Sequence, residues 1–334
     1  MPIAPLRIGV AGVGHFGRYH ALKVAASADA TLSGVFDTDS ERAKTIGWEA
    51  GAPALDFAAL IAASDALVIA APAEAHHALA VQALRAGRHV LVEKPIAATL
   101  AEADELGALA AQRGLVLQVG HLERFSAAFA AMEGKLGAPL YIEATRIAPF
   151  KQRGTDVSVI LDLMIHDLDL ILSLVASEID SVDAVGAAVA SEHADLANAR
   201  IRFANGAVAT ITASRVAMRT ERRMRVFAQD GYLAVDFANR RLTVIARGRG
   251  KPLPGVADFG IDEASWQEHD SLAAEHAAFV ASVRDGAPVL VDTAAGRRAL
   301  AAALLVTDGI AAARARMVAS GLIEQLEDRG GGSV

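Results

Sequence analysis

The sequence predicts an α/β protein in which an N-terminal domain with a parallel sheet precedes a C-terminal α+β domain with a large, mainly antiparallel open sheet. Its 334 residues are enough for two domains, each with its own core. Up to about residue 120, short β-branched runs alternate with Ala- and Leu-rich helical segments, which is typical of parallel strands joined by helices. From about residue 136 to 246, longer runs follow one another with few helices, which favours antiparallel pairing.

The individual strands follow from these runs. The parallel strands are expected in RIGVAG, TLSGVFD, ALVIAAP, HVLVEKP and VLQVG. The antiparallel strands are expected in LYIEATRI, NARIRFANG, AVATITASRV, RMRVFAQDG, YLAVDFA and RLTVIARG. Asn205-Gly206 lies between two alternating runs and is the signal of a two-residue hairpin turn.

Three helices are expected outside the parallel domain. One, at 157–175, interrupts the antiparallel strands, and two amphipathic helices near 269–285 and 293–315 close the chain. Residues at helical spacing that we expect in the core are Leu272, Phe279 and Val283. The expected division is a first domain at 1–121, a second domain for substrate binding and oligomerisation at 122–328, and a flexible tail at 329–334.

Composition and charge exclude several classes of partner. With 32 Lys and Arg against 39 Asp and Glu, the net charge is -7, so the chain has no basic field that would attract nucleic acid or anionic lipid. Apolar runs are broken by charge before they reach membrane-spanning length. The chain has no cysteine and shows no signal-peptide pattern near its start, so we expect a cytoplasmic protein with a small-molecule partner and no disulfide.

A glycine pattern near the start predicts the cofactor. Gly12, Gly14 and Gly17 form G-x-G-x-x-G directly after a strand and at the start of a helix, where backbone N–H groups can bind a diphosphate. Asp37 ends the second strand, where a carboxylate accepts hydrogen bonds from the ribose hydroxyls of NAD. The first domain is therefore predicted to be a Rossmann domain that binds NAD, while the nearby Arg42 keeps NADP open as an alternative.

Several segments together resemble the glucose-fructose oxidoreductase/inositol dehydrogenase (Gfo/Idh/MocA) family over nearly the whole chain. They are GVGHFGRYH, VIAAPAEAHHALAVQALRAGRHVLVEKPIA, VGHLERF, LDLMIHDLD and SLAAEHAAFVASVRDGAPVLV. The resemblance implies that Pro72 and His76 lie beside the cofactor and that Glu93-Lys94-Pro95 lies under the nicotinamide and substrate. The expected cofactor-binding residues are Gly12, Gly14, His15, Phe16, Gly17, Asp37, Thr38, Ala71, Pro72, His76, Glu93 and Lys94.

Within the family, the finer resemblance is to the UDP-N-acetylglucosamine 3-dehydrogenases and related UDP-sugar 3-dehydrogenases. It rests on GHLERF at 120–125, RIAPFKQRGTDVSVILDLMIHDLDLI at 146–171 and RRMRVFAQDGYLAVDF at 222–237. It implies NAD-dependent oxidation of the C3 hydroxyl of a UDP-N-acetylhexosamine. The resemblance to the family also implies a homodimer or homotetramer.

The expected catalytic residues are Lys94, Asp162 and His166. Alcohol oxidation by NAD needs a base for the hydroxyl proton and a group that holds the forming alkoxide. We expect His166 as the base, Lys94 as the group that polarises the oxygen, and Asp162, at i and i+4 with His166, as the residue that orients the imidazole. Exchanged roles for Lys94 and His166 remain open. Asp162, His166 and Asp169 could also be a polar helix face or bind a metal ion, although no metal is expected.

Cations and a histidine are expected to bind the substrate. Arginine suits a diphosphate because its planar fork matches two phosphate oxygens. The candidates are His121, Arg124, Arg146, Lys151 and Arg153. A second basic group, Arg219, Arg222, Arg223 and Arg225, lies on a strand and is explained equally well by a solvated sheet edge or a subunit contact.

Two other functions remain as alternatives. A dehydrogenase of the same family for a free sugar or inositol would not need the cations around 146–153. A catalytically silent, NAD-binding sugar sensor belongs to a different class, and the presence of Lys94, Asp162 and His166 together argues against it.

Overall fold

A five-stranded parallel sheet, in the order β2-β1-β3-β4-β5, forms the N-terminal part of the computed structural model, which describes residues 4–151 and 157–324. Its strands are β1 (Leu6–Ala11), β2 (Ala30–Phe36), β3 (Ala66–Ile69), β4 (His89–Glu93) and β5 (Leu117–Gly120). The connecting helices are α1 (His15–Ala25), α2 (Ser40–Ala50), α3 (Phe57–Ala63), α4 (Ala73–Arg85) and α5 (Leu100–Arg113). Every residue of β3 and β5 is buried, because helices cover both faces of the sheet. The predicted Rossmann domain is confirmed.

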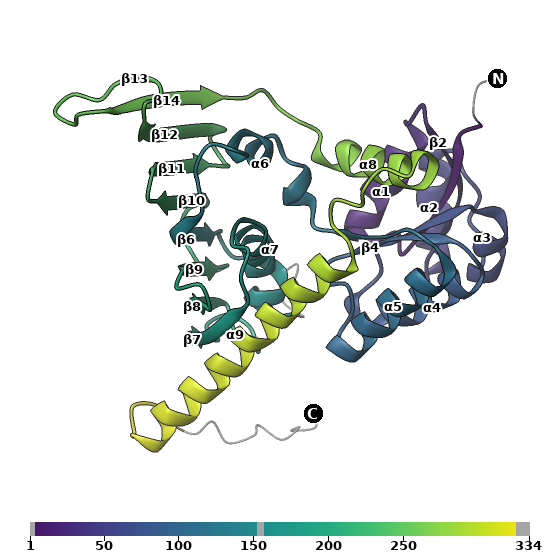
Figure 1. The fold of residues 1–334 in the computed structure, drawn as a ribbon. Helices are drawn as coiled ribbons and strands as arrows, with labels where there is room; N and C mark the ends of the chain where they lie inside the picture. Colours follow the sequence, from purple (N-terminus) through teal and green to yellow (C-terminus); the bar gives the residue numbers. More distant parts are fainter. Residues whose placement is uncertain (1–3, 152–156, 325–334) are drawn as a thin grey trace.

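A nine-stranded sheet, in the order β13-β14-β12-β11-β10-β6-β9-β8-β7, forms the second large layer (Figure 1). Its strands are β6 (Pro139–Ile147), β7 (Ile179–Ala187), β8 (Leu196–Phe203), β9 (Val208–Ser214), β10 (Glu221–Ala228), β11 (Gly231–Asp236), β12 (Arg241–Arg247), β13 (Lys251–Pro252) and β14 (Phe259–Ser265). The pairing of β6 with β9 is parallel, and the other pairings are antiparallel. Asn205 and Gly206 turn the chain between β8 and β9, with Gly206 at a φ of 89°, as the hairpin signal predicts.

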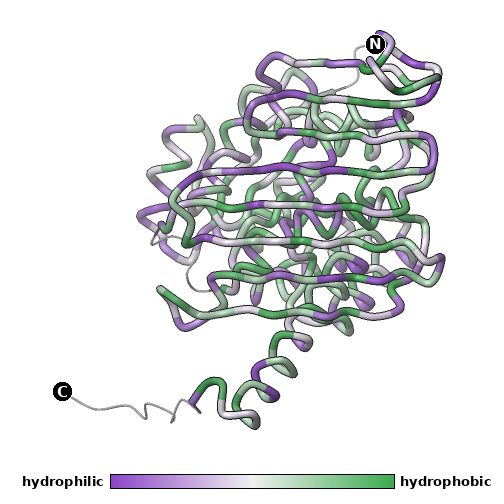
Figure 2. Tube along the Cα trace, turned by 90° about the vertical axis from the view of Figure 1, so that its left-hand side faces the viewer, coloured by the Kyte–Doolittle hydropathy of each residue, from purple (hydrophilic) through white to green (hydrophobic). Residues whose placement is uncertain are grey.

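Within residues 4–151 and 157–324, helices cover one face of this sheet. On that face lie α6 (Ala127–Met132) and α7 (Ile165–Leu174), whose apolar side chains form one core with the inward residues of the strands (Figure 1). The other face is open, and Figure 2 shows its mixture of hydrophilic and hydrophobic residues. The catalytic candidates therefore lie on the covered side, between the two sheets.

The helix predicted at 157–175 differs from the structure at its start. Residues Ile160–Met164 form a π-helical turn, and the α-helix α7 begins only at Ile165. A π turn is wider than an α turn and is often found at functional sites. The apolar periodicity of this segment does not distinguish the two kinds of turn.

The last two helices return to the first domain. α8 (Ser271–Asp285) and α9 (Thr293–Ala319) begin where Asp270 and Asp292 cap their first turns. Phe279 of α8 packs into the core around β1, and Leu300 of α9 packs into the core around β3 and β4. Leu272 and Phe279 are buried and Val283 packs against the same core, as predicted. Within residues 4–151 and 157–324, no helix is both long and apolar enough to cross a membrane.

Candidate active site

The glycine loop between β1 and α1 has the geometry of a diphosphate site. Gly12 has a φ of 82°, and a Cβ there would lie 2.5 Å from the backbone nitrogen of Ala71. A Cβ at Gly17 would lie 1.8 Å from the carbonyl oxygen of Gly12. At Gly14, by contrast, a Cβ would meet nothing within 4 Å, and no side chain caps the first turn of α1. The loop thus leaves open space in front of unpaired helix N–H groups, which fits the diphosphate of NAD.

Asp37 follows β2 and is fixed beside this loop. Its Oδ2 accepts a hydrogen bond of 2.9 Å from the backbone N–H of Val13, and its side chain is 6% exposed. Arg42 contacts the same carboxylate, with Nη1 3.2 Å from Oδ1. Thr38 and His15 are exposed nearby, and Phe16 packs edge-to-face on His20. The carboxylate therefore lies where the ribose of a bound dinucleotide is expected, with the arginine held against it.

His76 joins the loop after β3 to the segment after β4. Its Nδ1 lies 2.8 Å from the carbonyl oxygen of Pro95, and its Nε2 lies 2.8 Å from that of Ala71. The ring is 1% exposed, whereas Pro72, which precedes α4, is exposed. The peptide bond between Lys94 and Pro95 is cis. His76 therefore orders the two loops that border the expected nicotinamide position, and its own nitrogens are directed at carbonyl groups.

Lys94 reaches from the end of β4 to the π turn of the second domain. Its Nζ donates to the carbonyl oxygens of Leu161 and Asp162, at 3.2 and 2.9 Å. Lys94 and Asp162 also line a cavity of about 220 Å³, together with residues from the start of α4 and from α9. The structure thus brings two of the three expected catalytic residues together across the domain junction.

His166 lies next to Lys94 at the start of α7. Burial, followed by the positive charges of Lys94 and Arg146, holds the pKa of His166 well below the ordinary value for histidine. Its Nδ1 is buried and has no hydrogen-bond partner in the described part of the chain. The imidazole is therefore neutral at neutral pH and able to accept a proton.

His121, directly after β5, is a second buried imidazole of this region. Burial, then Lys94 and Arg124, lowers its pKa to about 3, and the residue is 1% exposed. Neither ring nitrogen has a partner among the described residues. Because no atom of the ring is accessible enough to meet a ligand in this conformation, its predicted contact with substrate stays a prediction.

Arg146, expected to bind the substrate, is already bound within the chain. Its Nε and Nη2 donate to the two oxygens of Asp167 at 2.8 and 2.9 Å, and its Nη1 donates to Glu123 at 3.2 Å. The residue is 5% exposed, and Glu123 also pairs with Arg222. These carboxylates occupy the guanidinium fork that a diphosphate would use, so we no longer assign Arg146 to the substrate. It fixes α7 against β6.

The other predicted cations are placed differently. Arg124 lies 3.6 Å from a carboxylate oxygen of Asp169, and burial raises the pKa of Asp169 to about 7. Lys151 is exposed, and Arg153 lies outside the described residues. In the second basic group, Arg222 faces the covered side, whereas Arg223 and Arg225 are exposed on the open face.

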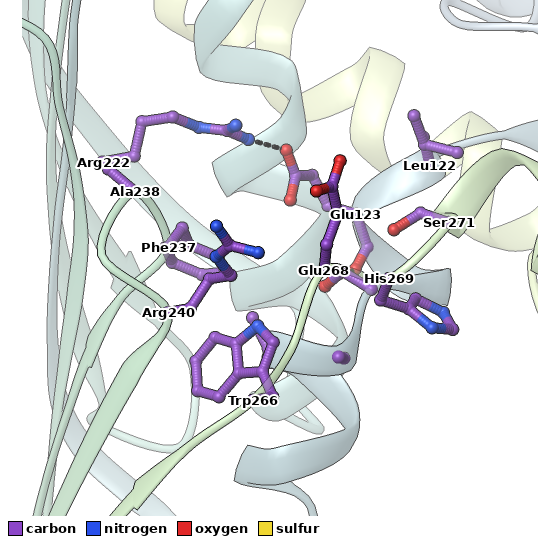
Figure 3. Close-up of a pocket in the computed structure, with 13 residues that line it drawn as sticks. Leu122, Glu123, Arg222, Phe237, Ala238, Arg240, Trp266, Glu268, His269 and Ser271 are labelled. Carbon is purple, nitrogen blue, oxygen red and sulfur yellow. Dashed lines mark hydrogen bonds and ion pairs between the residues drawn. The ribbon is translucent and has the colours of Figure 1, made fainter.

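A separate pocket of about 370 Å³ lies between the sheet and the segment that leads into α8 (Figure 3). Arg222, Phe237 and Arg240 line it from the sheet side, and Trp266 and Glu268 line it from the segment before α8. The dashed contact in Figure 3 joins Arg222 to a carboxylate. None of the three expected catalytic residues lines this pocket.

Sequence reasoning missed the ion pairs that Asp167, Asp169 and Glu123 form with arginines. Asp167 and Asp169 stand in the otherwise apolar segment MIHDLDLILSL, and an acid inside an apolar helix is a signal of a buried ion pair. Glu123 had no comparable signal, because its arginine partners are distant in the sequence. Glu93 was expected beside the cofactor, yet it is 8% exposed and its Oε1 lies 3.0 Å from Nε2 of His20.

Comparison with known proteins agrees with this geometry. Residues 6–121 match the model of the oxidoreductase family with an NAD-binding Rossmann fold (GFO_IDH_MocA), and residues 127–234 match a GFO/IDH/MocA C-terminal domain. The chain is 46% identical to the UDP-N-acetylglucosamine 3-dehydrogenase of Acidithiobacillus ferrooxidans over 90% of this chain and 96% of that protein. A solved structure of that enzyme, GnnA, superposes with a TM-score of 0.87 at 44% identity, covering 93% of this chain and 99% of the other.

A more distant relative has a different substrate in its name. The myo-inositol 2-dehydrogenase of Thermotoga maritima is 26% identical over 88% of this chain and 93% of its own length. The glycine loop, Asp37 and the family model together confirm the predicted cofactor, NAD, and the predicted class, oxidoreductase. The roles of the individual catalytic and substrate-binding residues stay predictions. The chain belongs to the Gfo/Idh/MocA family of NAD-dependent oxidoreductases.

Proposed function

We propose that this protein oxidises the C3 hydroxyl of UDP-N-acetylglucosamine to a ketone with NAD. One observation carries the proposal. Lys94 and Asp162 meet at the domain junction with His166 beside them, in a chain that is 46% identical to a UDP-N-acetylglucosamine 3-dehydrogenase. A hydride acceptor, a neutral base and an ammonium group are the parts that secondary-alcohol oxidation requires.

The residues divide the chemistry as follows. NAD, when bound, accepts the hydride from the carbinol carbon. His166 removes the hydroxyl proton, since its low pKa keeps the imidazole unprotonated. Lys94, held by the carbonyl groups of Leu161 and Asp162, places its ammonium group where it stabilises the forming alkoxide. Asp162 contributes through its backbone carbonyl as well as through the carboxylate expected to orient His166.

The diphosphate needs cations other than Arg146. We propose Lys151 and Arg153 for this role, because both precede the π turn that carries Asp162. Arg124 remains a candidate on the side of β5, although its guanidinium lies near Asp169. Charge-assisted bonds from such groups orient a phosphate and add affinity.

A free sugar or inositol is the second candidate substrate. It is favoured by the engagement of Arg146 with Asp167 and Glu123, which leaves fewer cations for a diphosphate. The likeness to a myo-inositol 2-dehydrogenase points the same way, at lower identity. The non-catalytic sensor is disfavoured, because a sensor does not need a lysine and a neutral histidine at the nicotinamide position.

We also propose a cytoplasmic location and a homodimer or homotetramer. The absence of cysteine from the 334 residues supports the location. The open face of the nine-stranded sheet supports association between copies.

Product analysis tests the substrate. The protein is incubated with NAD, a ketone trap and, separately, UDP-N-acetylglucosamine, UDP-N-acetylgalactosamine, free N-acetylglucosamine and myo-inositol, and the trapped product is identified by mass. The trap is needed because alcohol oxidation by NAD is uphill near neutral pH. We expect a trapped 3-keto product from UDP-N-acetylglucosamine. Product from the free sugar or from inositol alone would refute the proposed substrate.

Two variants serve as controls in the same assay. Lys94→Ala and His166→Ala should each lower turnover by at least 100-fold, as loss of a general base or of an alkoxide-stabilising group does. NAD binding, measured by calorimetry, should change little, because neither substitution alters the glycine loop that is expected to hold the diphosphate. A wild-type rate in either variant would remove that residue from the mechanism.

A further inference from the structure

A buried polar cluster lies beneath the active site, between α1, β4 and α8. It consists of His20, Glu93, Glu275 and His276, each at most 8% exposed. His20 Nδ1 lies 3.0 Å from Nε2 of His276, and His20 Nε2 lies 3.0 Å from Oε1 of Glu93. Figure 1 shows α1 and α8 side by side at this place. The imidazoles thus form a chain of hydrogen bonds that ends on the residue directly before Lys94.

Glu275 belongs to the cluster but takes no part in the chain of hydrogen bonds through His276, His20 and Glu93. It is 0% exposed, and neither of its carboxyl oxygens has a hydrogen-bond partner within the described residues. Nevertheless, ligand atoms of His20, Glu93 and Glu275 all lie within 4.8 Å of one another. A buried, unpartnered carboxylate beside a second carboxylate is costly unless a proton or a cation joins them.

The charges around the cluster do not compensate two carboxylates. Burial is the main cause that lowers the pKa of His276 to about 3, so this ring is neutral. The ammonium of Lys94 is directed at the carbonyl groups of the π turn, and that of Lys23 pairs with Asp270. A proton on one of the two carboxylates would reduce the cost of burying them side by side.

We propose that Glu275 is buried as the neutral, protonated acid next to the carboxylate of Glu93, and that this cluster, fixed by His20 and His276, positions Lys94 for the reaction. Glu93 is the connection to Lys94. Its Oε2 accepts a hydrogen bond of 3.3 Å from the backbone N–H of Lys94, and its carboxyl packs against Gly120, where a Cβ would lie 2.5 Å from Oε1. The positioning role rests on the function proposed for Lys94, whereas the protonated state of Glu275 does not.

The proton on Glu275 makes the stability of the folded protein depend on pH in a defined way. Burial, followed by the charge of Glu93, raises the pKa of Glu275 well above its ordinary value. At pH values between the ordinary pKa of glutamate and the raised pKa of Glu275, the folded protein holds a proton that the unfolded chain has released. Stability therefore falls as pH rises through this window, by about tenfold in the unfolding equilibrium constant per pH unit for one proton.

Glu275→Gln isolates this effect. Glutamine has the shape of the protonated acid and is neutral like it, but it does not titrate. Melting temperatures of the wild type and the variant are compared from pH 5.5 to 8.5, so that contributions common to both cancel. We expect the variant to gain on the wild type steadily as pH rises. The control is Glu41→Gln, an exposed carboxylate on α2 whose partner Lys44 stays charged throughout this range, so its difference from the wild type should not change with pH.

Three results would overturn the proposal. A difference between Glu275→Gln and the wild type that does not change with pH would mean that Glu275 holds no extra proton. One equivalent of a divalent metal in the purified wild type, absent from the variant, would mean that a cation occupies the cluster. Equal kcat in the wild type, Glu275→Gln and Glu275→Leu would remove the positioning role.

The kinetic arm separates positioning from folding. Glu275→Leu should lower kcat by at least tenfold with little change in KM for NAD, and Glu275→Gln should restore kcat to within about twofold of the wild type. If Glu275→Leu does not fold, full kcat in Glu275→Gln supports the proposal, and a tenfold loss there contradicts it. If no UDP-sugar is oxidised, the melting curves still decide on the proton, so failure of the two proposals can be told apart.

Discussion

At the residue scale, the neutral state of His166 sets the pH range over which the base role proposed for it is available. Burial and the cations Lys94 and Arg146 disfavour the imidazolium. A base with a lowered pKa is weaker, but it stays unprotonated when the medium becomes acidic. The imidazole of His166 is therefore a weaker base than an ordinary histidine, but its protonation state changes less with pH in the neutral range.

This state predicts the acid limb of the pH profile. Because the pKa of His166 is lowered, the protonation that stops catalysis occurs at a more acidic pH than for an ordinary histidine. We expect kcat/KM for the sugar nucleotide to stay flat from pH 7.5 down through 6.5 and to fall only below that. The measurement is a pH–rate profile at saturating NAD. An acid limb centred near 6.5 would contradict a buried, neutral His166.

At the element scale, the glycine loop combines close backbone contacts at Gly12 and Gly17 with open space at Gly14. Gly12 and Gly17 are needed by the backbone, since a Cβ at either position would collide with main-chain atoms. Gly14 is different, because a Cβ there meets nothing in the protein. The loop therefore allows folding and cofactor binding to be separated by one methyl group.

Gly14→Ala should fold normally and bind NAD poorly. The added methyl group points into the space in which the diphosphate approaches α1, so we expect NAD affinity to fall at least tenfold with the apo melting temperature within about 2 °C of the wild type. The control is Gly107→Ala in α5, where the Cβ would make ordinary contacts with Thr293. Wild-type NAD affinity in Gly14→Ala would place the diphosphate elsewhere.

The pair of Arg146 and Asp167 joins α7 to β6 through two hydrogen bonds between buried side chains. Asp167→Ala leaves a buried guanidinium without its bidentate partner, which costs about 3–5 kcal/mol. The pair of Arg297 and Asp104 lies on the surface, with side chains 43% and 55% exposed, so Asp104→Ala should cost at most about 1 kcal/mol. Urea unfolding measures both. Equal losses in the two variants would mean that the buried pair adds no stability.

Local patterns predicted most of the fold and the position of the reactive groups. These groups lie next to their strands in the sequence: the glycines follow β1, Asp37 follows β2 and Lys94 follows β4. The partners of Arg146 were not predictable in the same way, because Glu123 and Asp167 come from other elements and approach only in the folded chain. The π turn was missed because apolar spacing is compatible with both kinds of helix.

At the scale of the whole molecule, the open face of the nine-stranded sheet is a broad surface that the described helices leave uncovered. An aromatic group on this face consists of Tyr141, Phe227 and Tyr232. The ring centroid of Phe227 lies 5.7 Å from that of Tyr141 and 4.8 Å from that of Tyr232. Arg223 and Arg225 alternate with acidic residues beside it, such as Glu143. Aromatic residues flanked by both charges are typical of contacts between protein subunits.

Tyr232→Glu should therefore shift the protein toward the monomer. A charge placed among the aromatic rings would remain unpaired when the face is covered, which destabilises association. Light scattering coupled to size exclusion gives the mass. The control is Trp48→Glu on α2, an equally drastic change at a residue 88% exposed on the first domain. An unchanged mass for Tyr232→Glu would move the interface away from this part of the sheet.

The return of α8 and α9 to the first domain has a consequence for the synthesis of the protein. Phe279 and Leu300 complete cores whose other members come from β1, β3 and β4. A ribosome delivers those strands long before it delivers the two helices. The cores of the Rossmann domain therefore stay incomplete until almost the whole chain has emerged. Its dinucleotide site is completed late in synthesis, although its residues are synthesised first.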